Sequence, residues 1–157
     1  MRARAVLLCA LCLSSAWSAS AAVTGVAFVH GTGAQTDATN NYWTAGYVNA
    51  VRSGLPNPAN YVVINCDFTK YAWDNAAAGC LAGQLTTFIN SKGITDLVIE
   101  THSYGANVVR WIFSNPTWDS RYPLIIARTR WVNTIAGSSL GTPVSYTHLT
   151  LPTILRV

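Results

Sequence analysis

Two serines of this chain stand in the pattern small-x-Ser-x-Gly, which can place a hydroxyl group on a sharp turn between a strand and a helix. They are Ser103 in T-H-S-Y-G and Ser139 in G-S-S-L-G. A serine on such a turn is exposed at the end of a sheet, where it can attack a carbonyl carbon. A strand-like run precedes Ser103 and a helix-like run follows it, whereas Thr142, Pro143 and β-branched residues follow Ser139. We therefore expect Ser103 to be the nucleophile and the Ser139 segment to be a glycine-rich loop.

The neighbours of Ser103 largely fit such a turn. Gly105 is small, as the crowding of the strand and helix backbones requires two positions after the serine. Thr101 departs from the pattern, because a glycine or alanine is usual two positions before it. A helix that begins after Tyr104 would direct its N–H groups and the positive end of its dipole toward the reacting centre.

None of the three histidines stands where a base for Ser103 is expected. His30 precedes Gly31 at the end of the first predicted strand, where we expect a structural role. His102 is the sequence neighbour of Ser103, so its side chain points elsewhere, and we expect it to shape the site. His148 follows Ser103 too closely in the sequence to be the base of this arrangement. The sequence therefore supplies a nucleophile without an evident acid and base.

Short apolar strands alternate with longer helical patterns along the chain. Strands that alternate with helices favour an α/β fold, a parallel sheet with helices on both faces. We expect Asp74 to cap a helix and Gly93 to end it. The strands are predicted at Val23–Val29, Tyr61–Ile64, Asp96–Glu100 and Arg130–Ala136, and the helices at Asn41–Arg52, between Asp74 and Gly93, and at Ala106–Phe113.

Composition and charge limit the function classes. The chain has 157 residues, 50% of them hydrophobic and 10% charged, which excludes a disordered protein and fits one domain. The net charge is +4, but Arg2 and Arg4 lie at the N-terminus and no cluster of Lys and Arg remains without them. We therefore expect no nucleic-acid partner. No apolar run reaches the length of about 18 residues that spans a membrane, so we expect no stable membrane anchor.

The first segment predicts a secretory signal. Arg2 and Arg4 supply its positive charges, an apolar stretch follows, and Ala19-Ser20-Ala21 offers a cleavage site between small residues. We expect residues 1–21 to be removed and the protein to be secreted or periplasmic.

Cysteine positions agree with this destination. Cys9 and Cys12 leave with the signal, whereas Cys66 and Cys80 remain in a chain bound for an oxidising compartment. We predict a disulfide between Cys66 and Cys80. Two cysteines without a nearby set of histidines or carboxylates do not make a metal site, so no metal is expected.

Three motifs of this chain resemble those of the α/β-hydrolase family, and within it the secreted bacterial lipases and esterases. They are F-V-H-G-T-G after the first strand, T-H-S-Y-G before a helix, and I-A-G-S-S-L-G-T-P after the last predicted strand. By this resemblance Ser103 is the catalytic nucleophile, and the backbone N–H groups of Tyr104 and Thr32 form the oxyanion hole. The residues that it implies as shaping the site are His30, Gly31, His102 and Gly105.

The resemblance also implies the chemistry. It predicts hydrolysis of a small-molecule or lipid ester through an acyl-enzyme, without a cofactor. Polyester depolymerases and acyltransferases share this constellation, so the acyl acceptor stays open. The oligomeric state is left open as well. Tyr42, Trp43, Trp73 and Tyr104 could line an acyl pocket. Core packing is the alternative for Trp43 and Trp73, whereas Tyr104 is expected in the wall of the site.

The resemblance ends at about Pro143. From there V-S-Y-T-H-L-T-L-P-T replaces the expected continuation and resembles a translated sequencing-library adapter. We therefore expect residues 22–143 to be the N-terminal part of an α/β-hydrolase domain and residues 144–157 to be a non-native tail. The last strands and helices, with the acid and the base, would then be missing, and we expect no turnover from the 157-residue chain.

Two other function classes remain to be compared. A nucleotide-binding module would use Gly31-x-Gly33, but Thr36 stands where the third glycine is needed and Asp67 is too far along the chain to hold a ribose. This class is therefore disfavoured. A non-catalytic fragment, or a degenerate hydrolase fold used for binding, remains the alternative to the ester hydrolase.

Overall fold

Four parallel strands form the sheet in the computed structural model, which describes residues 21–138. They lie in the order β2-β1-β3-β4, and each neighbouring pair is parallel. The predicted α/β class with a parallel sheet is confirmed. The strands are β1 (Thr24–Val29), β2 (Tyr61–Val63), β3 (Asp96–His102) and β4 (Thr129–Ile135).

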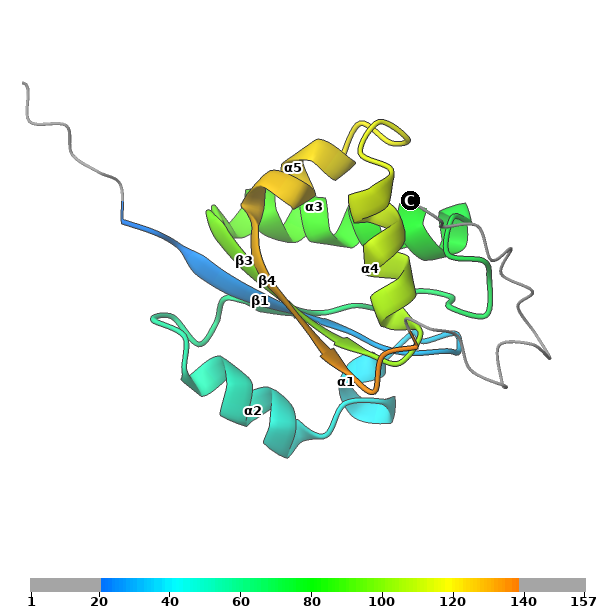
Figure 1. Ribbon diagram of the computed structural model, residues 1–157. Coiled ribbons are helices and arrows are strands. Elements are labelled where there is room, and N and C mark those ends of the chain that lie inside the picture. Colours follow the sequence, from blue (N-terminus) through cyan, green and yellow to red (C-terminus); the bar gives the residue numbers. More distant parts are fainter. Residues whose placement is uncertain (1–20, 139–157) are drawn as a thin grey trace, which may run out of the picture.

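Helices cover both faces of the sheet (Figure 1). Helices α1 (Ala38–Asn41) and α2 (Ala45–Ser53) lie on one face. Helices α3 (Cys80–Lys92), α4 (Gly105–Ser114) and α5 (Tyr122–Arg128) lie on the other. A π-helical turn, η1 (Asn75–Gly79), leads into α3.

The alternation of side chains along the strands divides the core between these two layers. In β1, Val26 and Phe28 point to the first face and pack against Trp43 and Val48. Ala27 and Val29 point to the second face, where the larger core contains the buried side chains of α3 and α4. Because β1 is buried on both faces, its sequence is a continuous apolar run rather than an alternating one.

The strand order places a reversal between β1 and β3. After β1 the chain passes through α1 and α2 and returns as β2 on one side of β1. The later strands, β3 and β4, lie on the other side of β1. The helix after β1 therefore covers one face and the helix after β3 covers the opposite face. The loops that follow these two strands diverge at the carboxyl edge of the sheet, which is where ligands bind in open α/β sheets.

Some helix boundaries differ from the prediction. The helix expected over Asn41–Arg52 begins later, at Ala45, because Thr44 caps α2 through the Tyr47 N–H. A separate short helix, α1, precedes it and ends at Asn41, and Asp37 caps α1 through the Asn40 N–H. Asp74 caps η1 and Gly93 ends α3 with a positive φ, as expected. Helix α5 was not predicted.

Strand β4 forms an edge of the sheet in the described part of the chain. Its side chains Trp131, Val132 and Ile135 are exposed, and Trp131 keeps 71% of its surface. No helix among residues 21–138 is long and apolar enough to cross a membrane. Of the expected signal, residues 1–21, only residue 21 belongs to the described chain. The expected tail, residues 144–157, lies outside it.

Candidate functional site

Ser103 occupies a strained turn at the carboxyl edge of the sheet. Strand β3 ends at His102 and helix α4 begins at Gly105, so two residues make the reversal. Ser103 has φ 50°, the left-handed region that costs a residue with a Cβ about 1–2 kcal/mol. Its N–H donates to the Ile135 carbonyl at 2.9 Å and thereby fixes the turn against β4. Strain of this kind is characteristic of functional positions.

Gly105 allows the close contact between β1 and α4 that this turn requires. A Cβ at this position would lie 2.2 Å from the His30 carbonyl oxygen and 3.1 Å from the Val29 carbonyl oxygen. The larger Thr101 is accommodated because it is fully buried and its hydroxyl donates to the Asn133 carbonyl of β4 at 3.0 Å.

The loop after β1 lies directly against the Ser103 turn. A Cβ on Gly31 would stand 2.9 Å from the Ser103 Cβ and 2.5 Å from the Tyr42 hydroxyl, so only a glycine fits between them. Within residues 21–138, neither the Thr32 N–H nor the Tyr104 N–H donates a hydrogen bond. Among the same residues, no side chain caps helix α4 either. Within the described residues, two N–H groups without a hydrogen-bond partner thus belong to the two segments that meet at Ser103, and such donors favour a negatively charged oxygen.

His30 is a buried structural residue of this loop. Its Nδ1–H donates to the Gly31 carbonyl at 2.8 Å, and its Nε2 accepts the Cys66 N–H at 3.3 Å. These two bonds require the neutral ring with its proton on Nδ1. Burial lowers the pKa of His30, and the ring stacks on Phe68 with the centroids 4.2 Å apart. His30 therefore supports the loop and has no free nitrogen for catalysis.

His102 lines a pocket on the α2 face of the sheet. Its Nδ1 lies 2.5 Å from the Tyr42 hydroxyl. The pocket has a volume of about 430 Å³, and its walls come from the segment that joins α1 to α2, from α2 itself and from the ends of β3 and β4. A pocket of this size holds a small organic group. The lining residues are Tyr42, Trp43, Thr44, Tyr47, His102 and Ile135.

The Tyr104 side chain lies in the core rather than in the wall of the site. It is 2% exposed, and its hydroxyl donates to the Lys70 carbonyl at 3.2 Å. Burial raises the pKa of Tyr104 to about 12. Trp43 is buried under α2, and Trp73 packs against the larger core. Of the four predicted pocket aromatics, Tyr42 and Trp43 line the pocket beside His102.

The described chain offers Ser103 no catalytic partner. No hydrogen bond within residues 21–138 joins the Ser103 Oγ to an imidazole or a carboxylate. Asp119 pairs with Arg121, which lowers the pKa of Asp119 to about 2. No group of three metal-binding side chains occurs among these residues either. Ser139 and His148 lie outside the described residues.

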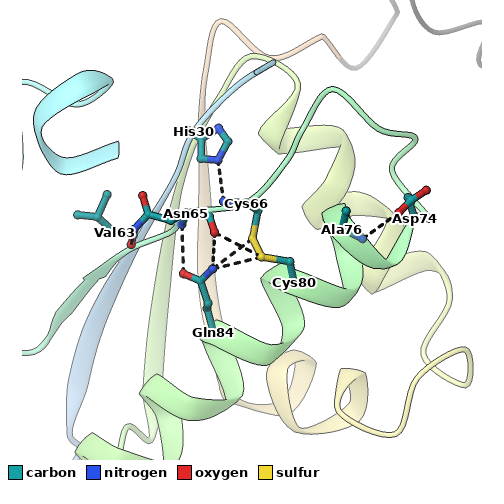
Figure 2. Close-up of a disulfide and its surroundings, with 8 residues drawn as sticks. All are labelled: His30, Val63, Asn65, Cys66, Asp74, Ala76, Cys80 and Gln84. Atoms are coloured by element: carbon teal, nitrogen blue, oxygen red, sulfur yellow. Dashed lines mark hydrogen bonds between the residues drawn. A yellow bond between two sulfur atoms is a disulfide. The ribbon is translucent and has the colours of Figure 1, made fainter. Parts of the chain in front are cut away.

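A disulfide joins Cys66 and Cys80, as predicted from the sequence (Figure 2). It connects the segment after β2 to the start of α3, with the two Cα atoms 5.9 Å apart. Asn65 and Gln84, which lie beside it, stand in no sequence pattern that predicts a role for them. The same holds for Glu100, whose buried carboxylate accepts from Tyr47 and Asn133. Paired polar side chains at strand ends carry no periodic signal that a sequence pattern reveals.

Comparison of the chain with protein-family models, with curated proteins and with solved structures found no match. The function must therefore be argued from the geometry of the site itself.

Proposed function

We propose that this protein is a serine hydrolase of carboxylic esters that acts through an acyl-enzyme on Ser103. One observation carries the proposal. A serine held at φ 50° between β3 and α4 lies against the loop after β1, and within residues 21–138 the N–H groups of Tyr104 and Thr32, on those same two segments, donate no hydrogen bond. A nucleophile beside two unused donors is the arrangement that acyl transfer needs.

In the proposed reaction, the Ser103 Oγ attacks the ester carbonyl and the Oγ–C bond forms. The carbonyl oxygen becomes an oxyanion and accepts hydrogen bonds from the Tyr104 and Thr32 N–H groups, each worth about 3–4 kcal/mol in the transition state. The alcohol leaves with the serine proton, and water then releases the acid. We place the base that carries this proton, and the acid that orients it, outside residues 21–138.

The family and the location belong to the same proposal. The likeness of T-H-S-Y-G and F-V-H-G-T-G to the motifs of secreted α/β-hydrolases supports a lipase or esterase acting on a small-molecule or lipid ester. The Cys66–Cys80 disulfide supports an oxidising compartment, as does the signal-like segment at residues 1–21.

The test compares two serines in the full-length protein. Ser103→Ala should abolish hydrolysis of p-nitrophenyl butyrate, because it removes the nucleophile. Ser139→Ala, in the other G-x-S-x-G sequence, should retain it. Loss of activity in the second variant with retention in the first would overturn the assignment.

A binding protein without turnover is the second candidate, and one observation favours it. The Ser103 Oγ has no hydrogen-bonded base within residues 21–138. A serine hydroxyl without a base is a poor nucleophile. The 157-residue chain should then release no p-nitrophenol above the Ser103→Ala background, and turnover by that chain would exclude this candidate.

A further inference from the structure

We propose that Gln84 is a positioning residue for the oxyanion loop, here defined as residues 30–35. In this inference, which rests on the proposed function, Gln84 and the Cys66–Cys80 disulfide hold Asn65 and Cys66, and these residues in turn fix the loop (Figure 2). Gln84 lies in α3 and is remote in sequence from every residue proposed for the reaction. Four sets of contacts support this assignment.

The first contact is a pair of hydrogen bonds between the Gln84 amide and the Asn65 backbone. The Oε1 atom accepts the Asn65 N–H at 3.1 Å, and the Nε2 donates to the Asn65 carbonyl at 2.6 Å. Asn65 follows β2, which is an edge strand of the sheet within the described residues. On the unpaired edge of the sheet, the Gln84 amide pairs with both the N–H and the carbonyl of Asn65, as the backbone of a neighbouring strand would.

The second contact is the disulfide, which fixes the next residue. Cys66 is bonded to Cys80, one helical turn before Gln84 on α3. The Gln84 Nε2 also lies 3.3 Å from the Cys66 sulfur and 3.2 Å from the Cys80 sulfur. The amide and the disulfide thus hold two consecutive residues to the same helix.

The third contact connects Cys66 to both ends of the oxyanion loop. Its N–H donates to the Nε2 of the buried His30 at 3.3 Å, and its carbonyl accepts the Gln35 N–H at 3.0 Å. The Gly33 carbonyl accepts the Phe68 N–H at 2.9 Å, which also holds the middle of the loop. Thr32, the proposed oxyanion donor, lies between His30 and Gln35 and is therefore placed by these bonds.

The fourth contact fixes the chain just beyond the loop. The Asn65 Oδ1 accepts the Ala38 N–H at 2.6 Å, so Asn65 also holds the first residue of α1. A displacement of Asn65 would consequently move the loop from its far side as well. A shift of about 1 Å in a catalytic group can lower a rate by roughly 100-fold, so this scaffold matters for the chemistry.

The test uses Gln84→Met, which keeps the length of the side chain and loses both hydrogen bonds to Asn65. Thr87→Val is the matched control. Thr87 lies on the same helix, and it lines a groove between α3 and β2 together with Gln84, but it makes no hydrogen bond to Asn65 or Cys66. Gln84→Glu is a second variant that keeps an acceptor for the Asn65 N–H. It covers the case in which the Met variant fails to fold.

Two quantities are measured in the full-length protein. The first is hydrogen–deuterium exchange of the peptides that contain Gln35, Ala38 and Phe68. The second is inactivation by diethyl p-nitrophenyl phosphate, separated into the rate constant of the chemical step and the inhibitor affinity. In Gln84→Met we expect faster exchange and a chemical step about 10- to 100-fold slower, with the affinity unchanged. Gln84→Glu should be intermediate, and Thr87→Val should match the wild type.

Unchanged exchange in Gln84→Met would overturn the proposal, because the amide would then not hold the loop. Faster exchange with an unchanged chemical step would overturn it too, because the loop position would not matter for the reaction. A wild-type Ser103 that the phosphate leaves unmodified would contradict the proposed function instead, and exchange alone would then decide whether Gln84 positions the loop.

Discussion

The contact between β1 and α4 makes a quantitative prediction at Gly105. The change Gly105→Ala places a Cβ 2.2 Å from the His30 carbonyl oxygen, whereas Cβ atoms in proteins essentially never come closer than 3.0 Å to such an atom. Helix α4 would have to withdraw by about 1 Å, because the opposing atom is backbone of a loop held by Cys66 and cannot rotate away.

The expected cost follows from two opposing terms. Overpacking of this kind costs about 1–3 kcal/mol, and more where the backbone itself must move. Alanine regains up to about 1 kcal/mol of helix propensity at the first residue of α4. Because the backbone must move here, the overpacking cost lies at the upper end of its range, and subtracting the gain in propensity leaves a net loss of about 2 kcal/mol in the free energy of unfolding, or about 3–5 °C in melting temperature for each kcal/mol.

Gly46→Ala is the matched control for this measurement. Gly46 is also at the start of a helix, α2, but a Cβ there would meet nothing within 4 Å. This variant should gain up to about 1 kcal/mol from helix propensity alone. Urea unfolding followed by circular dichroism measures both. If Gly105→Ala were as stable as Gly46→Ala, the close approach of β1 and α4 would not exist.

Three further outcomes are expected. Ser103→Gly should be more stable than Ser103→Ala by about 1 kcal/mol in urea unfolding, since glycine relieves the left-handed strain at φ 50°; equal stabilities would argue against this turn. Because burial lowers the pKa of His30 below 6.5, the unfolded chain binds a proton at a higher pH than the folded protein, so the free energy of unfolding should fall as the pH drops below about 6.5. In His30→Gln the free energy of unfolding should no longer fall in this pH range. If it still falls, a group other than His30 causes the pH dependence. Reduction of the Cys66–Cys80 disulfide should lower the free energy of unfolding by about 3 kcal/mol, measured with and without reductant, and no change would mean that the bond constrains little.

The elements of this fold were largely predictable because their sequence signals are local. The β-branched runs predict β1 and β3, Asp74 marks a helix start, and Gly93 marks a helix end through its positive φ. Helix α5 was missed although Pro123 stands in its first turn, because seven residues give too few periods for a helical pattern.

The site was only partly predictable, for a physical reason. Ser103 and Gly105 obey steric rules that act within five residues, so the motif alone indicates them. The support of the oxyanion loop by Gln84 and Asn65 depends on contacts between α3 and the segment after β2, which no spacing in the sequence encodes. The buried position of Tyr104 was likewise unforeseen, because the bond of its hydroxyl to the Lys70 carbonyl depends on how a distant loop folds back.

The central claim is that Ser103 forms a covalent bond with its substrate. Peptide mass spectrometry tests it most directly, after diethyl p-nitrophenyl phosphate has been incubated with the protein in the full-length form that the proposal expects. The account predicts one diethyl phosphate group on Ser103, with release of one p-nitrophenol, and no label in Ser103→Ala. Stoichiometric label on another serine, or full reaction without modification of Ser103, would contradict it.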